Sequence, residues 1–245
     1  MDFTNFEIEQ NKIEKLIAKL ETDEKSPICD GPVDPLIYCQ ANGLKILWLL
    51  KEAYDNDGDG AGGWSLAKLL GDPLVYEKFL KSSKSKNTWY PVIYSSFGIL
   101  NNFIKYDDME FIDKDQSMVS ILRKIAFINI NKLAGKSTSN DIDLERIFSQ
   151  NKEILKMQIE LYNPDIVIGG NSLKYYMGIL NLNGVSPVTS NYGTKYYLEK
   201  NRVYINSYHP GRIGIKRDHY VNEEYIDDII EIVENALPFL KRNIT

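Results

Sequence analysis

Three short apolar runs constrain the fold of this chain most. They are KILWLL at 45–50, IAFINI at 125–130 and the DIVI of DIVIGG at 165–168. A run that is apolar at successive positions is typical of a strand covered on both faces, as in a parallel sheet. Because helical patterns separate the runs, strand and helix alternate along the chain. This order predicts an α/β protein with three layers, in which helices cover both faces of a mainly parallel sheet of about four strands.

The segments between these runs carry helical and turn patterns. Apolar side chains at helical spacing predict helices over 5–20, from 65 to about 80, around 89–104, over 144–162 and over 225–240, with KSSKSK as a turn before the third of them. The pair KYYLEK and RVYINSY predicts a hairpin around Asn201, and its second arm supplies the fourth strand. No linker-like tract divides the chain. We therefore expect one domain over 1–245, with residues 1–40 as a helical extension packed on it.

Polar and glycine residues collect where the expected strands end. In an open parallel sheet, ligands bind beyond the carboxyl ends of the strands, because the loops converge there. The residues at these ends are Lys51, Glu52 and Tyr54; Asn129, Asn131 and Lys132; Gly169, Gly170, Asn171 and Ser172; and His209, Pro210, Gly211 and Arg212. The sequence thus predicts a crevice that contains a carboxylate, amides, a histidine and cations.

The loop KEAYDNDGDGAGGWS, residues 51–65, resembles half of a calcium site. Asp55, Asp57, Asp59 and Gly60 fit the first half of an EF-hand loop. However, the twelfth position, where a bidentate glutamate is needed, holds Leu66, and the run before the loop predicts a strand instead of a helix. The pattern therefore favours a solvated turn, and we expect no metal.

Composition sets three further limits. The start of the sequence lacks the pattern of a signal peptide, and no stretch of about 18 apolar residues occurs, so we expect a cytoplasmic protein without a membrane contact. Cys29 and Cys39 are too few for a disulfide framework or a four-thiolate metal site. The net charge of −5 means that any binding to DNA needs a local basic patch.

The ordered motifs KEAYD, GGWS, FINIxK, PDIVIGG and YHPGRIGIKR resemble those of the uracil-DNA glycosylase superfamily. The likeness covers roughly residues 44–240, and it depends on the order and spacing of the motifs instead of on any single one. The resemblance implies the uracil-DNA glycosylase-like fold. It also implies an enzyme that flips a base out of DNA and breaks its glycosidic bond without a metal or organic cofactor.

The resemblance also implies roles for individual residues. A carboxylate, Glu52 or Asp55, stabilises the sugar cation or orients water, and His209 donates a hydrogen bond to an oxygen of the departing base. Three further residues would contact the flipped base: Asn129 reads the pyrimidine edge, the base stacks on Trp64, and Tyr54 lies against its C5 face.

The other implied roles concern the DNA itself. Ile213 inserts into the duplex as an apolar wedge. The phosphates are contacted by Arg212, Arg217, Lys132 and the helix start at Gly170–Ser172.

Structural roles compete with several of these assignments. Trp64 can be a core residue, Asn129 can make a structural hydrogen bond, the His-Pro pair can be a capped turn, and KSSKSK can be a solvated loop. The sequence also departs from the family: Gly211 stands where the family keeps a serine after His-Pro, and Ala53 and Asp55 stand where some branches keep proline and a histidine or glycine. These departures, together with the glycine-rich loop, suggest a changed or enlarged pocket.

The sequence therefore predicts a monofunctional DNA glycosylase that excises uracil or a modified pyrimidine, including a modified cytosine of the kind found in phage DNA. Its partner is DNA, and its setting is DNA repair or defence against foreign DNA. Two alternatives remain open at this point. One is a catalytically silent nucleic-acid-binding or interaction module on the same fold, and the other is a phosphoesterase that uses the Asp-rich loop with a divalent ion.

Overall fold

A computed structural model describes residues 2–41, 43–55, 60–135, 139–211 and 222–240. Within them, one mixed sheet has seven strands in the order β1-β3-β2-β4-β7-β6-β5. The strands are β1 (Gly31–Pro32), β2 (Ile46–Tyr54), β3 (Ile125–Gly135), β4 (Ile166–Gly170), β5 (Val188–Thr189), β6 (Lys195–Glu199) and β7 (Arg202–Ser207). The chain is therefore an α/β protein, as its alternating pattern predicts.

The four expected strands form the parallel centre of this sheet. Strands β3, β2, β4 and β7 pair in parallel, whereas β1 pairs antiparallel with β3, and β6 and β5 continue the other edge antiparallel. The expected hairpin is present, with Lys200 and Asn201 at φ 49° and 58° in its turn. The prediction of about four strands was wrong for the whole sheet. The strands β1 and β5 have two residues each, and neither contains an apolar run from which a strand could be predicted.

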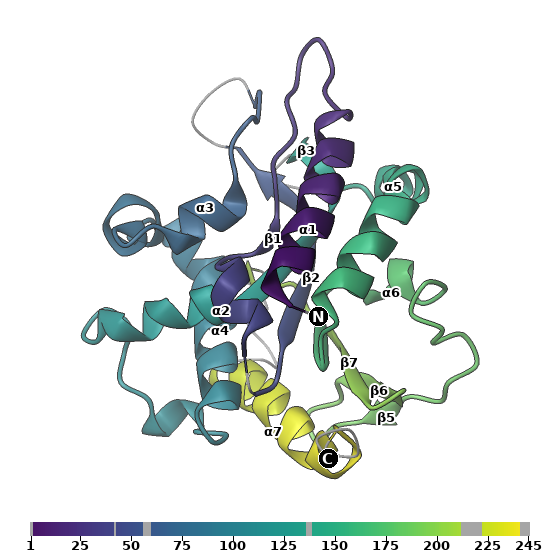
Figure 1. The fold of residues 1–245 in the computed structure, drawn as a ribbon. Coiled ribbons are helices and arrows are strands. Elements are labelled where there is room, and N and C mark those ends of the chain that lie inside the picture. The colour runs from purple at the N-terminus through teal and green to yellow at the C-terminus, as the bar shows by residue number, and fades with distance from the viewer. Residues whose placement is uncertain (1, 42, 56–59, 136–138, 212–221, 241–245) are drawn as a thin grey trace.

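Helices cover both faces of the sheet (Figure 1). One face carries α1 (Phe3–Ala18), α2 (Pro35–Cys39), α5 (Asp141–Tyr162) and α6 (Leu173–Tyr176). The other carries α3 (Leu66–Gly71), α4 (Ser83–Leu100) and α7 (Asn222–Leu240), with a π-helical turn η1 (Tyr76–Leu80) and two 3-10 segments, η2 (Tyr106–Asp108) and η3 (Gln116–Lys124). A separate hydrophobic cluster fills each interface between sheet and helices, so the core has two layers.

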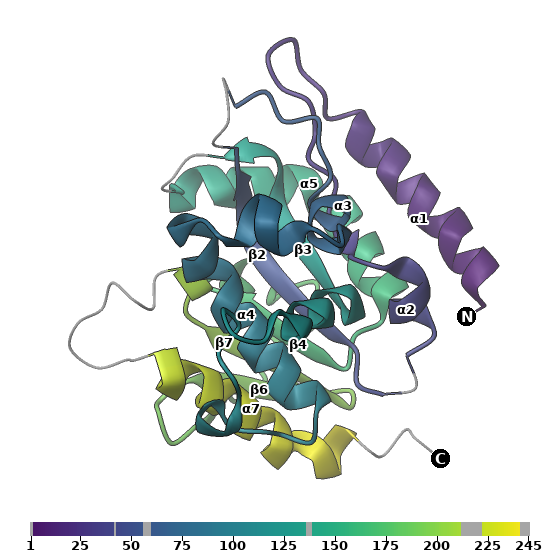
Figure 2. The same ribbon diagram turned by 90° about the vertical axis from the view of Figure 1, so that its left-hand side faces the viewer.

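Two helix boundaries differ from the prediction. The helix expected from Ser65 to Leu80 is split, because Asp72 is extended in front of Pro73, as residues before proline tend to be. The helix α4 begins at Ser83, inside the stretch expected to be a turn, because the Ser82 side chain accepts a hydrogen bond from the Ser85 amide and caps it. Figure 2 shows α3 and α4 in front of strands β2 and β4. Leu80 and Trp89 of these segments belong to the hydrophobic cluster that also contains Trp48 and Phe127 of the sheet.

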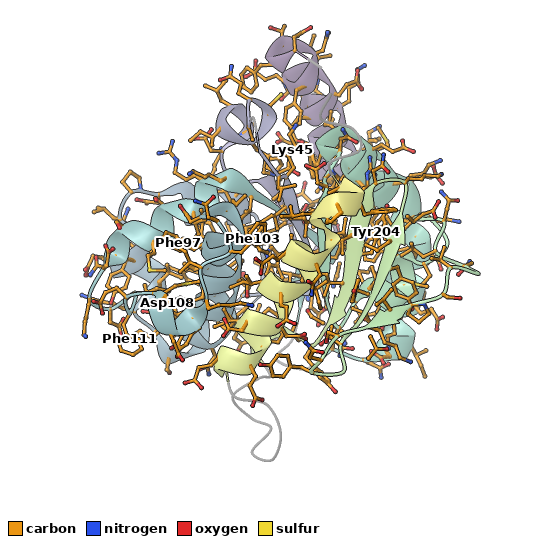
Figure 3. The ribbon with its side chains drawn as sticks, turned by 90° about the horizontal axis from the view of Figure 1, so that it is seen from below. Lys45, Phe97, Phe103, Asp108, Phe111 and Tyr204 are labelled. Carbon is orange, nitrogen blue, oxygen red and sulfur yellow. The ribbon has the colours of Figure 1, made fainter. Side chains whose placement is uncertain are left out.

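Alternation along the strands decides which side chains face which layer. Trp48, Leu50 and Phe127 belong to the cluster under α4, whereas Leu49 and Ile128 belong to the cluster under α5. On the α4 side, α7 completes the layer. Figure 3 shows this helix with Phe97 and Phe103 on one side of it and Tyr204 of β7 on the other.

The first forty residues contribute more than the helical extension that we expected. α1 and α2 lie on the α5 face, but β1 joins the sheet itself as an edge strand. No helix in the described ranges combines the length and the apolar composition needed to cross a membrane.

Candidate active-site cavity

A cavity of about 370 Å³ opens on the α4 side, beyond the carboxyl ends of the central strands. The strands β2 and β3 and the turn after β7 supply one wall. The loop before α3, the turn η1 and the start of α4 supply the other. Its lining residues are Leu50, Glu52, Ala53, Tyr54, Trp64, Leu66, Lys78, Phe79, Ser82, Ser85, Thr88, Trp89, Asn129 and His209.

Five of the residues singled out in the sequence meet in this cavity. Glu52, Tyr54, Trp64, Asn129 and His209 all line it, although they lie far apart along the chain. The parallel register explains the convergence, because it brings the ends of β2, β3 and β7 to the same edge of the sheet. The crevice with a carboxylate, an amide and a histidine is therefore present.

The carboxylate of Glu52 is held in a defined orientation. Ser139 Oγ donates to Oε1 at 2.6 Å, and Asn131 Nδ2 donates to Oε2 at 3.2 Å. The register of β2 against β3 shifts between Glu52 and Tyr54 and brings Gly135 onto the carboxylate, where a Cβ atom would lie 2.2 Å from Glu52 Cδ. A larger residue at 135 would displace the carboxylate from this position. An ionised carboxylate has about four acceptor positions, so two donors leave capacity for a water molecule.

The other candidate carboxylate, Asp55, makes a different contact. Its side chain accepts a hydrogen bond from the Gly62 amide at 3.0 Å, and it is not among the lining residues. The bond joins the two described ends of the glycine-rich loop. Of the two acids that the sequence left open, Glu52 is the one at the cavity.

Asn129 presents a buried polar atom to the cavity. The residue is only 2% exposed, and its Oδ1 has no hydrogen-bond partner within the described residues. A buried amide oxygen without a partner costs free energy, so such atoms are rare unless something outside the protein satisfies them. Within the described part of the chain, this atom does not make the structural hydrogen bond that competed with a binding role. Asn129 Oδ1 is a ready acceptor for a ligand.

One hydrogen bond of His209 indicates its tautomer. Nδ1 accepts a hydrogen bond from the Gly211 amide at 3.1 Å. In the neutral ring Nδ1 is then the acceptor nitrogen, and the hydrogen resides on Nε2. The ring therefore has a donor on its other side.

The turn that carries His209 is packed closely on both sides. A Cβ atom on Gly211 would lie 2.6 Å from Thr88 Oγ1, and one on Gly170 would lie 3.1 Å from Pro210 Cδ. Thr88 thus occupies the space into which the side chain of a serine at 211 would extend. This contact gives a physical reason for the glycine that departs from the family pattern.

Sequence reasoning missed one wall of the cavity. Phe79 and Trp89 pack edge to face at 6.4 Å, and Trp89 also contacts Phe127 at 5.0 Å. Together with Trp64 they give aromatic surface around the space. Three hydroxyl residues follow at helical spacing: Ser82, which caps α4, and Ser85 and Thr88 within α4. That spacing, beside an aromatic residue, was the signal that could have identified this wall.

Two predicted phosphate contacts were wrong. Lys132 is fully buried on the α5 face, where Nζ lies 2.8 Å from both carboxylate oxygens of Asp30 and 2.7 Å from Gln158 Oε1. Burial lowers the pKa of Lys132, and Asp30 opposes this shift. Ser172 is also buried, and its hydroxyl donates to the Leu49 carbonyl at 2.7 Å. Neither side chain can reach a DNA backbone.

Other assignments lie beyond what the structure describes. Arg212, Ile213 and Arg217 fall outside the described residues, as do Asp57 and Asp59 of the acidic loop. Among the residues that are described, no three His, Cys, Asp or Glu side chains gather in a way that could hold a metal ion. Neither Cys29 nor Cys39, both of which are described, forms a disulfide.

Comparison with known proteins found no family model and no curated protein that matches the chain. The interpretation of the cavity therefore depends on its own residues and geometry.

Proposed function

We propose that this chain is a monofunctional DNA glycosylase with the uracil-DNA glycosylase-like fold. It removes uracil or a modified pyrimidine from DNA, leaves an abasic site, and serves in DNA repair or in defence against foreign DNA. One observation carries the proposal: Glu52, Asn129 and His209 line the same cavity, and one of them offers a buried acceptor without a partner in the described part of the chain.

The reaction needs charge stabilisation at two points. As the bond between C1′ and the base nitrogen breaks, its electron pair leaves with the base and the sugar becomes cationic. The Glu52 carboxylate suits the sugar side, where it stabilises the cation and orients a water molecule. The water oxygen bonds to C1′, and the proton that it loses balances the charge of the departing base. The Nε2 hydrogen of His209 suits the base side, where it stabilises the anion through a hydrogen bond to an oxygen.

Recognition of the base requires a side chain that hydrogen bonds to the edge of the base and an aromatic surface on which the base stacks. The amide of Asn129 combines a donor and an acceptor, which matches the paired groups on a pyrimidine edge. Trp64, Phe79 and Trp89 offer aromatic surface for a ring outside the duplex. A cavity of about 370 Å³ lies within the range of about 300–1,000 Å³ that is usual for small-molecule sites.

The wall formed by α4 favours a modified pyrimidine over plain uracil. Ser82, Ser85 and Thr88 supply hydroxyl groups, and Lys78 supplies a cation that also pairs with Asp72 at 2.6 Å. These groups can hydrogen bond to a polar substituent on the base. The modified cytosines of phage DNA carry substituents of this kind, and they are the substrates that we place first.

A panel of duplexes tests the proposal. Each holds uracil, a modified uracil or a modified cytosine, and is incubated with the protein in EDTA and then treated with alkali, which cuts at abasic sites. We expect cutting of at least one modified duplex. Glu52→Gln should lower the rate about 10²–10⁴-fold. Glu153→Gln, at an exposed position on α5, is the matched control and should leave the rate unchanged.

Other outcomes would support the alternatives. Binding to every duplex without any abasic site would favour a silent binding module. Strand cutting that appears only with magnesium or calcium would favour a phosphoesterase. Full activity of Glu52→Gln would show that the acid of the reaction lies elsewhere.

A further inference from the structure

The segment of residues 26–30 lies between the two parts of the chain that carry Asn129 and Trp64. On one side, the Ile28 amide donates to the Lys132 carbonyl of β3 at 2.6 Å. On the other, the Cys29 amide donates to the Trp64 carbonyl at 3.1 Å, and the Leu66 amide donates to the Cys29 carbonyl at 2.8 Å. Because both contacts are backbone pairs, a shift of this segment must move both neighbours.

Asp30 anchors this segment to β3 at Asn129. The residue is 3% exposed, and its Oδ2 accepts the backbone amide hydrogen of Asn129 at 2.6 Å. Lys132 Nζ and Gln158 Nε2 supply its other hydrogen bonds, each at 2.8 Å. Asn129 is therefore held through its backbone from the α5 face while its side chain faces the cavity.

The short length of β1 explains why an acceptor is needed there. β1 pairs with Phe127 and Ala126 only, so the next outward amide of β3, that of Asn129, lies beyond the end of this strand. A buried amide without an acceptor is costly, and Asp30 satisfies it. Lys132 contacts both oxygens of the carboxylate and so fixes the direction in which Oδ2 points.

We infer that Asp30 is a positioning residue, which with Lys132 and Gln158 holds the amide of Asn129 and the ring of Trp64 in register across the cavity. The inference rests on the proposed function, and it assigns a role in base recognition to the first forty residues. A buried ion pair contributes little net stability compared with apolar residues of the same shape, so a geometric role is a better reason for its presence.

Two double variants separate the geometric role from stability. The first, Asp30→Asn with Lys132→Met, removes the ion pair but keeps an oxygen that can accept the Asn129 amide hydrogen; we call it the acceptor-retaining variant. The second, Asp30→Leu with Lys132→Met, removes the acceptor as well; we call it the acceptor-free variant. Neither leaves a buried charge alone. We expect the acceptor-retaining variant to keep most of the excision rate, and the acceptor-free variant to lose about 100-fold, the scale of a misplacement of about 1 Å.

The loss must also depend on Asn129. When Asn129→Ala is already present, the two substitutions of the acceptor-free variant should cost less activity than in the wild type, because only the part of the effect that acts through Trp64 remains. Equal losses with and without Asn129→Ala would overturn the inference. If the acceptor-free variant does not fold, Asp30→Ala with Lys132→Met gives the same comparison with a smaller side chain.

Hydrogen exchange supplies a readout that needs no activity. Amides in 61–66 and 127–131 should exchange faster in the acceptor-free variant than in the acceptor-retaining variant. Equal exchange in the two variants would overturn the inference, whether or not the wild type excises a base. A wild type without excision, together with the expected exchange, would reject the proposed function and keep the structural role of Asp30.

Discussion

Strand β3 carries a buried polar side chain on each face, and the two side chains differ in their hydrogen-bond partners. On the α4 face, Asn129 Oδ1 is buried beside a cavity and has no partner within the described residues. On the α5 face, three residues further along, the Lys132 ammonium is enclosed by Asp30 and Gln158. Both sites contain polar atoms away from water, yet within the described residues only the second finds hydrogen-bond partners for them.

This difference distinguishes the proposed binding site on the α4 face from the buried polar network on the α5 face. An unsatisfied buried group costs about 1–3 kcal/mol, so the Asn129 side chain weakens the fold unless a ligand completes it. A complete polar network fixes geometry and needs nothing from outside. We therefore place the proposed active site on the α4 face. The polar network on the α5 face fixes the geometry of the strand that carries Asn129.

Removal of Lys132 should give the largest effect on stability. Lys132→Ala leaves the Asp30 carboxylate buried without its cation, and we expect a loss of about 3–5 kcal/mol in the free energy of unfolding, measured by urea denaturation. Lys156→Ala is the control, because Lys156 is half exposed and its distance to Glu160 is 3.9 Å. If Lys132→Ala and Lys156→Ala lower the free energy of unfolding by similar amounts, the buried network does not stabilise the fold.

The close packing behind His209 should give the next largest effect. In Gly211→Ala the new Cβ meets Thr88 Oγ1, and overpacking of this kind costs about 1–3 kcal/mol. Excision should fall too, because the strain moves the turn that carries His209. Thr88→Ala should restore stability to Gly211→Ala. The control is Gly43→Ala, since a Cβ there meets nothing within 4 Å.

Failure of that rescue would be informative. If Gly211→Ala with Thr88→Ala is no more stable than Gly211→Ala alone, the contact with Thr88 is not what requires glycine. The loss would then come from the approach of the new Cβ to the His209 ring, at 3.3 Å from Nδ1.

Two buried asparagines sharpen the comparison directly. Asn129→Ala removes an oxygen without a partner among the described residues, so it should leave the free energy of unfolding unchanged or raise it by up to about 3 kcal/mol, while excision falls. Asn151→Ala removes a donor to the Ile130 carbonyl at 2.9 Å and should cost about 1–3 kcal/mol, with little direct effect on recognition. A larger stability loss in Asn129→Ala than in Asn151→Ala would contradict the comparison, because Asn129 would then be the asparagine that stabilises the fold.

The sequence predicts the centre of this fold well because its signal is local. Each parallel strand is a continuous apolar run, and the rule for strand ends selects Glu52, Asn129 and His209 without any knowledge of contacts. The edge strands β1 and β5 are too short to show a pattern. Their place in the sheet depends on partners far along the chain.

The errors at the site have the same origin. Lys132 follows a strand and is charged, so an exposed position was the natural expectation; its partner Asp30 is 102 residues away. The α4 wall was missed because KSSKSK has the composition of a turn, whereas Ser82 caps a helix there. Contacts between residues far apart in the sequence determine the position of Lys132 and of the α4 wall. A local sequence pattern does not show such contacts.

The smallest predicted effect concerns Asp113, an exposed counterpart of Asp30. Its carboxylate also accepts several hydrogen bonds, from Tyr90, from Tyr76 and from Lys86, but its side chain is 52% exposed. These donors, that of Tyr90 most of all, lower the pKa of Asp113 from 3.8 to about 2. Because water screens an exposed group, we expect Asp113→Asn to cost less than about 1 kcal/mol at pH 7.

The sign of its pH dependence follows from the lowered pKa. The folded protein holds the ionised form more strongly than the unfolded chain, so the stabilisation is complete above about pH 4 and is lost as the pH falls through about 2. Denaturation of the wild type and Asp113→Asn at several pH values should show a difference that shrinks over this interval, and Tyr90→Phe should show part of it. A difference as large as that of Lys132→Ala would mean that the number of donors, and not burial, sets the strength of a carboxylate site.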